Sequence, residues 1–346
     1  MAEVTILGQI AKIRDFEKGY WASHVINTGF RFGLLNALAE SIEGMTIQDL
    51  AVKLMLYEPY LKIWCQTAYH FEILDYDERS RFKLQSFLAD VLGLDMFSRN
   101  YPALENRNAG APRRDGNDSR LSEYIRTGRT VSTVKFPDAS VATYWATKNI
   151  TTIFLSMIFP EKDQIKKRLE GGIKFLDIGC GSGNLIIDFA HIFKNSVFVG
   201  TDLDIYGIES AERSISDLHL EDRVTAENMG GEEIHYHEEF EVVSMILTLH
   251  EILPESRFKA VFNAYKALKH GGLILMLDYP YPGRLEDFRS PRYDYGIIEQ
   301  YFEAFSGIVH ISKEEQDDLL SKAGFKCIER INVGDGGMLD FITAVK

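Results

Sequence analysis

Residues 174–183 read KFLDIGCGSG, and LIIDFAHIF follows at 185–193. The quoted stretch opens with a short apolar run interrupted by Asp177 and passes into glycines at 179, 181 and 183. In 185–193 the apolar side chains recur at helical spacing, which indicates a helix. The order strand, glycine loop and helix brings backbone N–H groups and the positive end of a helix against a ligand. This stretch therefore predicts a ligand-binding turn on an α/β sheet.

The spacing of the glycines separates two classes of ligand. The dinucleotide fingerprint G-x-G-x-x-G would require glycine at position 184, where the chain has Asn184. The chain instead reads D-x-G-x-G-x-G, with Asp177 ahead of Gly179, Gly181 and Gly183. An anion would be poorly placed beside Asp177, whereas the ammonium group of a methionine moiety would be well placed. The pattern resembles motif I of the class I S-adenosylmethionine (SAM) methyltransferases, which implies that Asp177 and the three glycines bind SAM.

Length and composition are ordinary for a globular protein, and 346 residues could hold two domains. The net charge of −13 argues against a general nucleic-acid binder, because phosphate binding needs a basic surface. Cys65, Cys180 and Cys327 are widely separated, so they predict neither a metal site nor a disulfide framework. The sequence has no long apolar run and no signal-peptide pattern, so we expect a cytoplasmic protein that does not bind a membrane.

The N-terminal part, residues 1–98, reads as a mainly helical domain. Apolar residues cover more than one face of the helices expected over 3–40, so these helices must be buried in their own domain or by a second subunit. Residues 44–77 predict a helix-turn-helix whose first helix is capped by Thr46. ILDYDERSRFKLQ at 73–85 predicts a hairpin. We interpret these elements together as a winged-helix unit.

A winged helix suggests DNA binding, but the expected second helix offers Lys62 as its only lysine or arginine. A dimerisation module is therefore favoured. The helical entry, GLLNALAE at 33–40 and the wing ahead of a SAM domain resemble the small-molecule O-methyltransferases of plants, bacteria and archaea. In that family the N-terminal module joins two subunits, so the resemblance implies a homodimer with no nucleic-acid partner.

Residues 99–140 differ from the rest because they carry an excess of basic residues in an acidic chain. They are either a solvated connector or a lid that draws an anionic substrate into the active site. Residues 141–346 are then the SAM-binding catalytic domain. At its start, the apolar stripe of 141–159 is typical of core packing. The resemblance also makes Trp145 and Met157 candidate contacts to the methyl acceptor.

From residue 171 onward strands and helices alternate, which predicts a Rossmann-like, doubly wound parallel sheet with helices on both faces. The expected strands are listed in chain order: 173–178, 197–201, one within 223–233, 240–247, 272–278, and an antiparallel pair near 325–332 and 338–345. Ligands on such sheets bind beyond the carboxyl ends of the strands. The residues at those ends are therefore the candidate site.

Asp202 ends the second expected strand, where a carboxylate can accept both ribose hydroxyls of a nucleoside. The alternative for Asp202 is a turn residue or helix cap, although Asp204 is the better cap. In the resembled family an acid after the third strand meets the adenine amine. This chain has no acid at that place, so Asn228 and Met229 become the candidates for the adenine contact.

His250 ends the fourth expected strand. In the resembled family a histidine here removes the proton of the acceptor hydroxyl while the oxygen attacks the sulfonium methyl. A phenol, with a pKa near ~10, is a weak nucleophile at pH 7, and an imidazole that titrates near ~6.5 can deprotonate it. The alternative is a histidine that caps the following helix.

Two acids could hold the tautomer of this base. Asp278 ends the fifth expected strand, and Glu314 lies at the start of a later helix, both at places where the resembled family keeps an orienting acid. Glu315 lies beside Glu314, but it also fits a capping box with Ser312.

The sequence thus predicts an enzyme that transfers methyl from SAM to a hydroxyl of a small molecule, aromatic or polyketide-like, with His250 as general base. Methylation of carbon or nitrogen, with His250 only orienting the substrate, remains an alternative. A second alternative is a transcriptional regulator in which the winged helix binds DNA and SAM is a sensed ligand.

Overall fold

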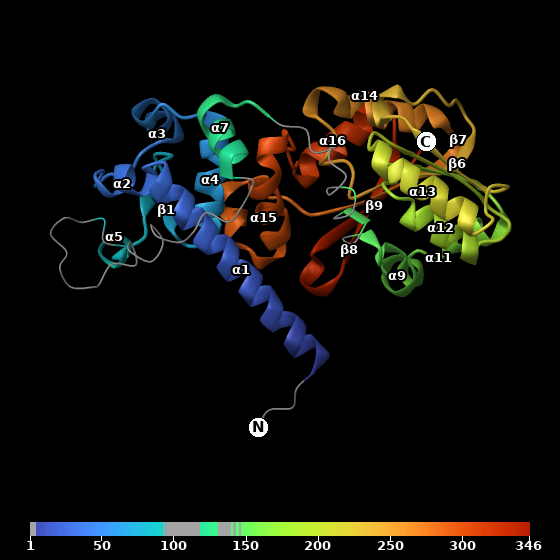
Figure 1. Cartoon of the computed structure of the whole chain (residues 1–346), viewed down its shortest axis with the longest axis horizontal. Helices are drawn as coiled ribbons and strands as arrows, with labels where there is room; N and C mark the ends of the chain where they lie inside the picture. The colour runs from blue at the N-terminus through green and yellow to red at the C-terminus, as the bar shows by residue number, and fades with distance from the viewer. Residues whose placement is uncertain (1–4, 93, 95–117, 131–139, 141–142, 145–146) are drawn as a thin grey trace. The chain divides into compact units, whose positions relative to one another are not determined.

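The computed structural model describes residues 5–346 except 93, 95–117, 131–139, 141–142 and 145–146. The chain divides into two compact units (Figure 1). The first comprises residues 1–131, 284–290 and 297–305, and the second comprises 132–283, 291–296 and 306–346. Among the described residues, no helix is both long enough and apolar enough to cross a membrane.

The first unit is mainly helical. It contains α1 (Ile6–Arg31), α2 (Leu34–Ala39), α3 (Ile47–Leu54), α4 (Glu58–His70), the strands β1 (Leu74–Tyr76) and β2 (Phe82–Leu84), α5 (Leu88–Val91) and α7 (Asp118–Thr127). Thr46 caps α3 in a capping box with Asp49, as the sequence predicts for Thr46. The strands β1 and β2 pair antiparallel, which confirms the expected hairpin.

Segments from the C-terminal half complete this unit. One is η3 (Leu285–Arg289). The other runs over 297–305 and comprises α15 (Asp294–Glu303) from residue 297 onward and the first two residues of η5 (Ala304–Ser306). Tyr301 of α15 is buried, and its hydroxyl donates to Oγ1 of Thr28 in α1 at 2.9 Å. The indole N–H of Trp64 donates to the carbonyl of Val25 at 3.0 Å, which fixes α4 against α1.

The second unit is built on a seven-stranded sheet in the order β5-β4-β3-β6-β7-β9-β8. Its strands are β3 (Lys174–Ile178), β4 (Val197–Asp202), β5 (Val224–Asn228), β6 (Phe240–Ile246), β7 (Leu268–Asp278), β8 (Lys326–Val333) and β9 (Leu339–Val345). The first five strands in that order pair parallel, and β9 pairs antiparallel with both β7 and β8. The predicted α/β class, with its antiparallel end, is confirmed.

Helices cover both faces of the sheet because adjacent strand residues point to opposite sides. Phe175 of β3 packs with α11 (Asp163–Gly171), α12 (Asn184–Ile192) and α13 (Ile205–Asp217). The next residue, Leu176, packs with α14 (Pro254–Ala267) and α16 (Lys313–Ala323). Ahead of the sheet, α9 (Ile150–Ile153), η1 (Phe154–Ile158) and α10 (Phe159–Glu161) lead into α11. The carboxyl edge of the parallel strands is thus left for the site.

Candidate active site at the carboxyl edge of the sheet

The glycine loop joins β3 to α12 and is held by the end of β4. The N–H groups of Gly179 and Cys180 donate to the carbonyl of Thr201 at 2.7 and 3.0 Å. Gly179 has φ +79°, and a Cβ there would lie 2.3 Å from Cγ2 of Thr248. Only glycine fits such a position, because any side chain would clash and strain the backbone. Gly181 and Gly183 also have positive φ, of 52° and 77°.

Asp177 lies inside the sheet and only 3% of it is exposed. Its Oδ1 accepts the Ser244 hydroxyl at 2.5 Å. The pKa of Asp177 is raised to about 7, chiefly by burial and also by the charge of Asp202, while the Ser244 hydrogen bond acts to lower it. This carboxyl group therefore lies within the sheet, two residues ahead of the first glycine of the loop.

Asp202 holds both the glycine loop and the turn that follows β4. Its Oδ2 accepts the N–H of Gly181 at 2.8 Å, and its Oδ1 accepts the N–H of Asp204 at 2.8 Å. Burial raises the pKa of Asp202, while the N–H groups of Asp204 and Gly181 act to lower it. Asp204 caps α13 by accepting the N–H of Tyr206, as expected for Asp204.

Asn228 and Met229, the two candidates for the adenine contact, are both tied to Asp202. The side-chain amide of Asn228 donates to the carbonyl of Asp202 at 2.9 Å, and the N–H of Met229 donates to the same oxygen at 3.0 Å. Asn228 is exposed and Met229 is half-buried. The ends of β3, β4 and β5 thus meet at one place, as parallel strands require.

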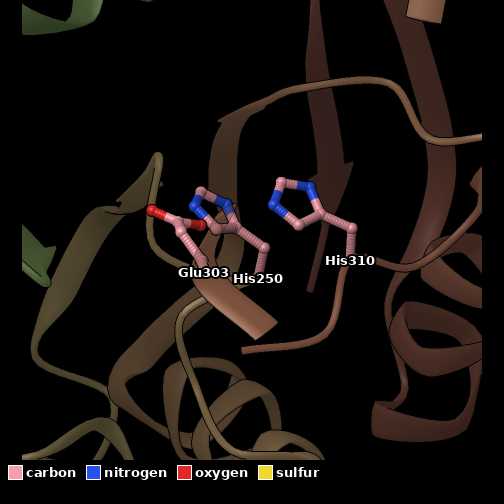
Figure 2. A group of neighbouring side chains, drawn as sticks. All are labelled: His250, Glu303 and His310. Carbon is pink, nitrogen blue, oxygen red and sulfur yellow. The ribbon is translucent and has the colours of Figure 1, made fainter. Parts of the chain in front are cut away.

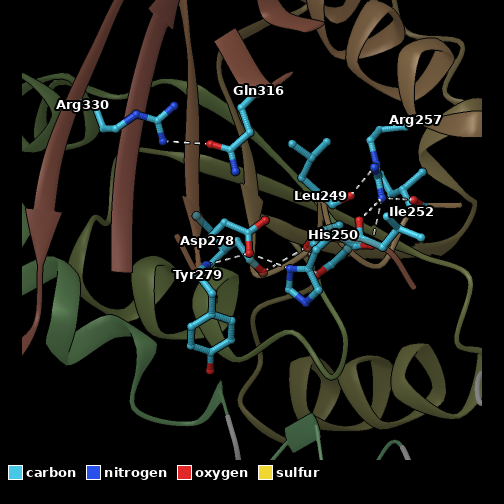
Figure 3. Close-up of polar contacts among 12 residues, drawn as sticks. Leu249, His250, Ile252, Arg257, Asp278, Tyr279, Gln316 and Arg330 are labelled. Atoms are coloured by element: carbon cyan, nitrogen blue, oxygen red, sulfur yellow. Dashed lines mark hydrogen bonds and ion pairs between the residues drawn. The ribbon is translucent and has the colours of Figure 1, made fainter. Parts of the chain in front are cut away.

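His250 lies in the turn after β6 and is buried (Figure 3). Its Nδ1 lies 2.6 Å from Oδ1 of Asp278. Because a carboxylate only accepts, we assign the hydrogen to Nδ1, which leaves the lone pair on Nε2. The N-cap of α14 is Leu253, so the alternative in which His250 caps this helix is wrong.

Asp278 is ionised beside this histidine. Burial acts to raise its pKa, but the charge and hydrogen bond of His250, together with His310 and the N–H of Tyr279, lower it overall. The N–H of Tyr279 donates to Oδ1 of Asp278 at 2.8 Å. A buried carboxylate held in this way keeps a neighbouring imidazole in one tautomer and stabilises its cation.

The remaining sequence candidates lie elsewhere. Glu314 is exposed in the first turn of α16, and Glu315 forms the capping box with Ser312. Met157 lies in the π-helical turn η1 and is 45% exposed. Trp145 and most of the 99–140 connector fall outside the described residues.

Three contacts of the site escape sequence reasoning. His310 stacks on His250 with ring centroids 4.4 Å apart (Figure 2). Thr248 closes on Gly179, and Arg257 donates to the carbonyls of Leu249, His250, Ile252 and Val309. Nothing in the local sequence around His310 or Arg257 marks either residue, because their partners are brought close only by the fold.

Comparisons with known proteins identify a domain family for part of the chain. Residues 175–272 match the family model described as a methyltransferase domain. The chain is 27% identical over 190 residues to a tRNA N(3)-methylcytidine methyltransferase of Schizosaccharomyces pombe, a match that covers 51% of this chain and 59% of that protein. The chain therefore spans less than two thirds of the length of this relative.

Two solved structures share the fold along almost the whole chain. One is an O-methyltransferase family 2 protein of Planctomyces limnophilus in complex with apigenin, with a TM-score of 0.69 at 15% identity, covering 97% of this chain and 96% of that one. The other is human N-acetylserotonin methyltransferase in complex with SAM, with a TM-score of 0.50 at 15% identity, covering 100% and 99%.

Residues 175–272 thus carry a methyltransferase domain, and the chain shares the fold of O-methyltransferase structures. Two features of the carboxyl edge would fit S-adenosylmethionine. A Cβ at Gly181 would meet nothing nearer than Cγ2 of Thr143 at 3.8 Å, which leaves room for a ligand at the main chain, and the carboxylate of Asp202 lies beside it.

Proposed function

We propose that this protein transfers the methyl group of SAM to a hydroxyl of a small molecule, with His250 as general base. The observation that carries the proposal is the buried pair of His250 and Asp278 at the carboxyl edge of the sheet that also carries the glycine loop. Bound SAM would supply an activated methyl on a sulfonium leaving group. The protein then has to align the acceptor and remove one proton.

The residues that we propose to bind the cofactor lie at the same edge of the sheet. The open space at Gly181 would let SAM approach the backbone of the loop, which Gly179 and Gly183 shape by their positive φ, and Asp177 would support the loop from within the sheet. Asp202 would accept the ribose hydroxyls, since each carboxylate oxygen offers more than one lone pair. Asn228 and Met229 would meet the adenine.

For the acceptor we propose an aromatic molecule. Tyr279 and Tyr295 stack with centroids 6.2 Å apart, and Tyr279 lies 6.2 Å from the ring of His250. Flat aromatic side chains beside a base suit a flat aromatic substrate. The apigenin complex of the Planctomyces protein supports the same substrate class by analogy. Trp145 and Met157 remain candidate acceptor contacts, and Glu314 a candidate orienting acid.

We also propose that residues 1–98 form a dimerisation domain, that 99–140 connect it to the catalytic domain and that 141–346 carry the chemistry. Support comes from α1, where Ile6, Ile10, Ile13 and Tyr20 are exposed at helical spacing. An exposed apolar stripe on a long helix is typical of a surface that packs against another helix. The partner we infer is a second copy of this chain.

The test of the base compares three proteins with SAM and apigenin as the probe acceptor, followed by mass spectrometry of the product. His250→Gln should lower the rate by about 10²- to 10⁴-fold, the usual contribution of a general base. Binding of S-adenosylhomocysteine, measured by calorimetry, should change little. The matched control is His235→Gln, because His235 is exposed. Wild-type turnover in His250→Gln would contradict the assignment of the base.

A second set of probes separates the atom that is methylated. A phenol, the matching aniline and a phenol blocked at oxygen are offered to the wild-type protein with SAM. Methylation of the phenol oxygen alone supports the proposal. Methylation of the aniline nitrogen or of a ring carbon supports the alternative, in which His250 only orients the substrate.

A further inference from the structure

A second buried histidine, His310, lies beside the proposed base His250. This residue lies in the segment before α16, and only 4% of it is exposed. Its ring lies 4.4 Å from that of His250 at an interplanar angle of 20°. The ring centroid of His310 lies 5.7 Å from that of Tyr281 and 6.4 Å from that of Tyr279. His310 is therefore enclosed by aromatic side chains on the side where the proposed base stands.

The geometry of this pair excludes a proton relay between the two rings. The lone pairs and N–H bonds of an imidazole lie in the plane of its ring, and the two rings face each other nearly parallel. Each ring therefore presents its π face, and neither can donate a hydrogen bond to the other. What remains is dispersion and the attraction of a π face for a cation that forms on the neighbouring ring.

The protonation of His310 suits that contact. Burial lowers the pKa of His310 well below its usual value, the charges of His250 and Arg257 lower it further, and Asp278 opposes them. His310 thus stays neutral at neutral pH and does not compete with His250 for a proton. A second charged imidazole at this distance would repel the imidazolium that the reaction creates.

Arg257 is hydrogen-bonded to the backbone of the turn that carries His250 (Figure 3) and to the backbone just before His310. Its Nη2 lies 3.1 Å from the carbonyl oxygen of His250 and 2.7 Å from that of Val309, the residue before His310. The Nε of Arg257 donates to the carbonyl of Leu249 at 3.1 Å. One buried guanidinium therefore holds the turn after β6 against the segment before α16, which keeps the stacked rings in register.

We propose that His310 is a positioning residue that holds the ring plane of His250, so that Nδ1 stays on Asp278 and Nε2 points toward the acceptor. Asp278 constrains the ring at one edge, and His310 constrains it across its face. Each contact alone leaves one rotation open, whereas the two together fix the ring. The assignment of a role in catalysis rests on the proposed function of His250, but the fixed ring is a property of the protein without substrate.

The test uses nuclear magnetic resonance of the full-length protein labelled with ¹⁵N-histidine. Long-range ¹⁵N–¹H spectra report the tautomer of each ring, and His250→Gln identifies the signals of His250. In the wild type we expect a single tautomer with hydrogen on Nδ1. His310→Phe keeps a flat ring and should keep that tautomer. His310→Leu removes the ring. It should lower the ratio of the Nδ1–H tautomer of His250 to its Nε2–H tautomer about 2- to 12-fold, the range for the loss of an aromatic pair.

An unchanged single tautomer in His310→Leu would overturn the proposal, and so would a tautomer mixture in a folded His310→Phe. If His310→Leu does not fold, His310→Gln has no ring and is read in the same way. Steady-state kinetics are measured with apigenin as the acceptor. His310→Leu should lower kcat more than it changes KM, whereas His310→Phe should keep kcat near that of the wild type. A fixed ring without any methyl transfer would refute the proposed function alone and leave the positioning role intact.

Discussion

At the scale of single residues, the site depends on acids whose surroundings set their charge. Asp177, near the end of β3, and Asp278, at the end of β7, are both buried carboxyl groups. Their pKa values nevertheless shift in opposite directions. Asp278 has the imidazole of His250 as its partner, whereas Asp177 has a hydroxyl and faces the charge of Asp202. The partner, more than burial, decides which acid is ionised.

The raised pKa of Asp177 predicts a pH dependence of stability. Its folded pKa of about 7 lies above the reference value of 3.8, so the folded state binds more protons between these values. The free energy of unfolding contributed by this group is fully present below pH 3.8 and is lost as the pH rises through 7. At most roughly 4 kcal/mol is involved, at about 1.36 kcal/mol for each pKa unit.

Asp177→Asn should remove this dependence. Urea unfolding at pH 5 and pH 8 would show a drop in the wild type and a smaller drop in Asp177→Asn. Glu209→Gln is the control, because Glu209 is exposed on α13. Equal drops in all three proteins would mean that Asp177 is ionised at both pH values.

Asp202 gives a prediction for cofactor binding. Asp202→Ala should weaken binding of S-adenosylhomocysteine by roughly 1.5–3 kcal/mol, the range for hydrogen bonds to a charged group. Asp202→Asn keeps one acceptor oxygen and should lose less. Calorimetry at one pH measures both variants. An affinity equal to that of the wild type in Asp202→Ala would rule out the ribose contact.

At the scale of the elements, the glycine loop is fitted against the turn after β6. A Cβ on Gly179 would lie 2.3 Å from Cγ2 and 2.4 Å from Oγ1 of Thr248. A Cβ on Gly181 would meet only Cγ2 of Thr143, at 3.8 Å. The two glycines share positive φ but differ in the space around them, so they form a matched pair.

Gly179→Ala should therefore destabilise the protein by about 2–5 kcal/mol, the sum of left-handed strain and overpacking. Gly181→Ala should cost only about 1–2 kcal/mol, because strain alone applies. Thermal unfolding of both variants without ligand checks the difference. Equal losses would show that Thr248 moves aside and does not define the loop.

At the scale of the whole molecule, the exposed stripe of α1 predicts a dimer in solution. Ile13 is 53% exposed within this stripe, and Ala11 is exposed outside it. Ile13→Glu should convert the dimer to a monomer, since a charge in an apolar helix interface remains unpaired. Ala11→Glu adds the same charge away from the stripe and should leave the dimer intact. Light scattering after gel filtration measures the mass, and a monomeric wild type would end the proposal.

The sequence by itself determined the sheet and its order of elements. The run before the glycines, the alternation of strands and helices and the closing antiparallel pair are local patterns, and the structure confirms them within a few residues of the predicted ends. Thr46 and Asp204 are likewise readable as caps, because capping acts between residues close in the chain.

Only the tertiary structure decided what surrounds the candidate base. The sequence pointed to His250 and offered Asp278 and Glu314 as its partners, and the fold brought Asp278 to within 2.6 Å while Glu314 is exposed. It also placed His310 on the face of His250 and joined Arg257 to the backbone carbonyls of His250 and Val309. These residues come from separate loops and a helix, and no periodicity or spacing along the chain encodes which of them meet. Their contacts follow from how the strands are ordered in the sheet, because that order sets which turns share an edge.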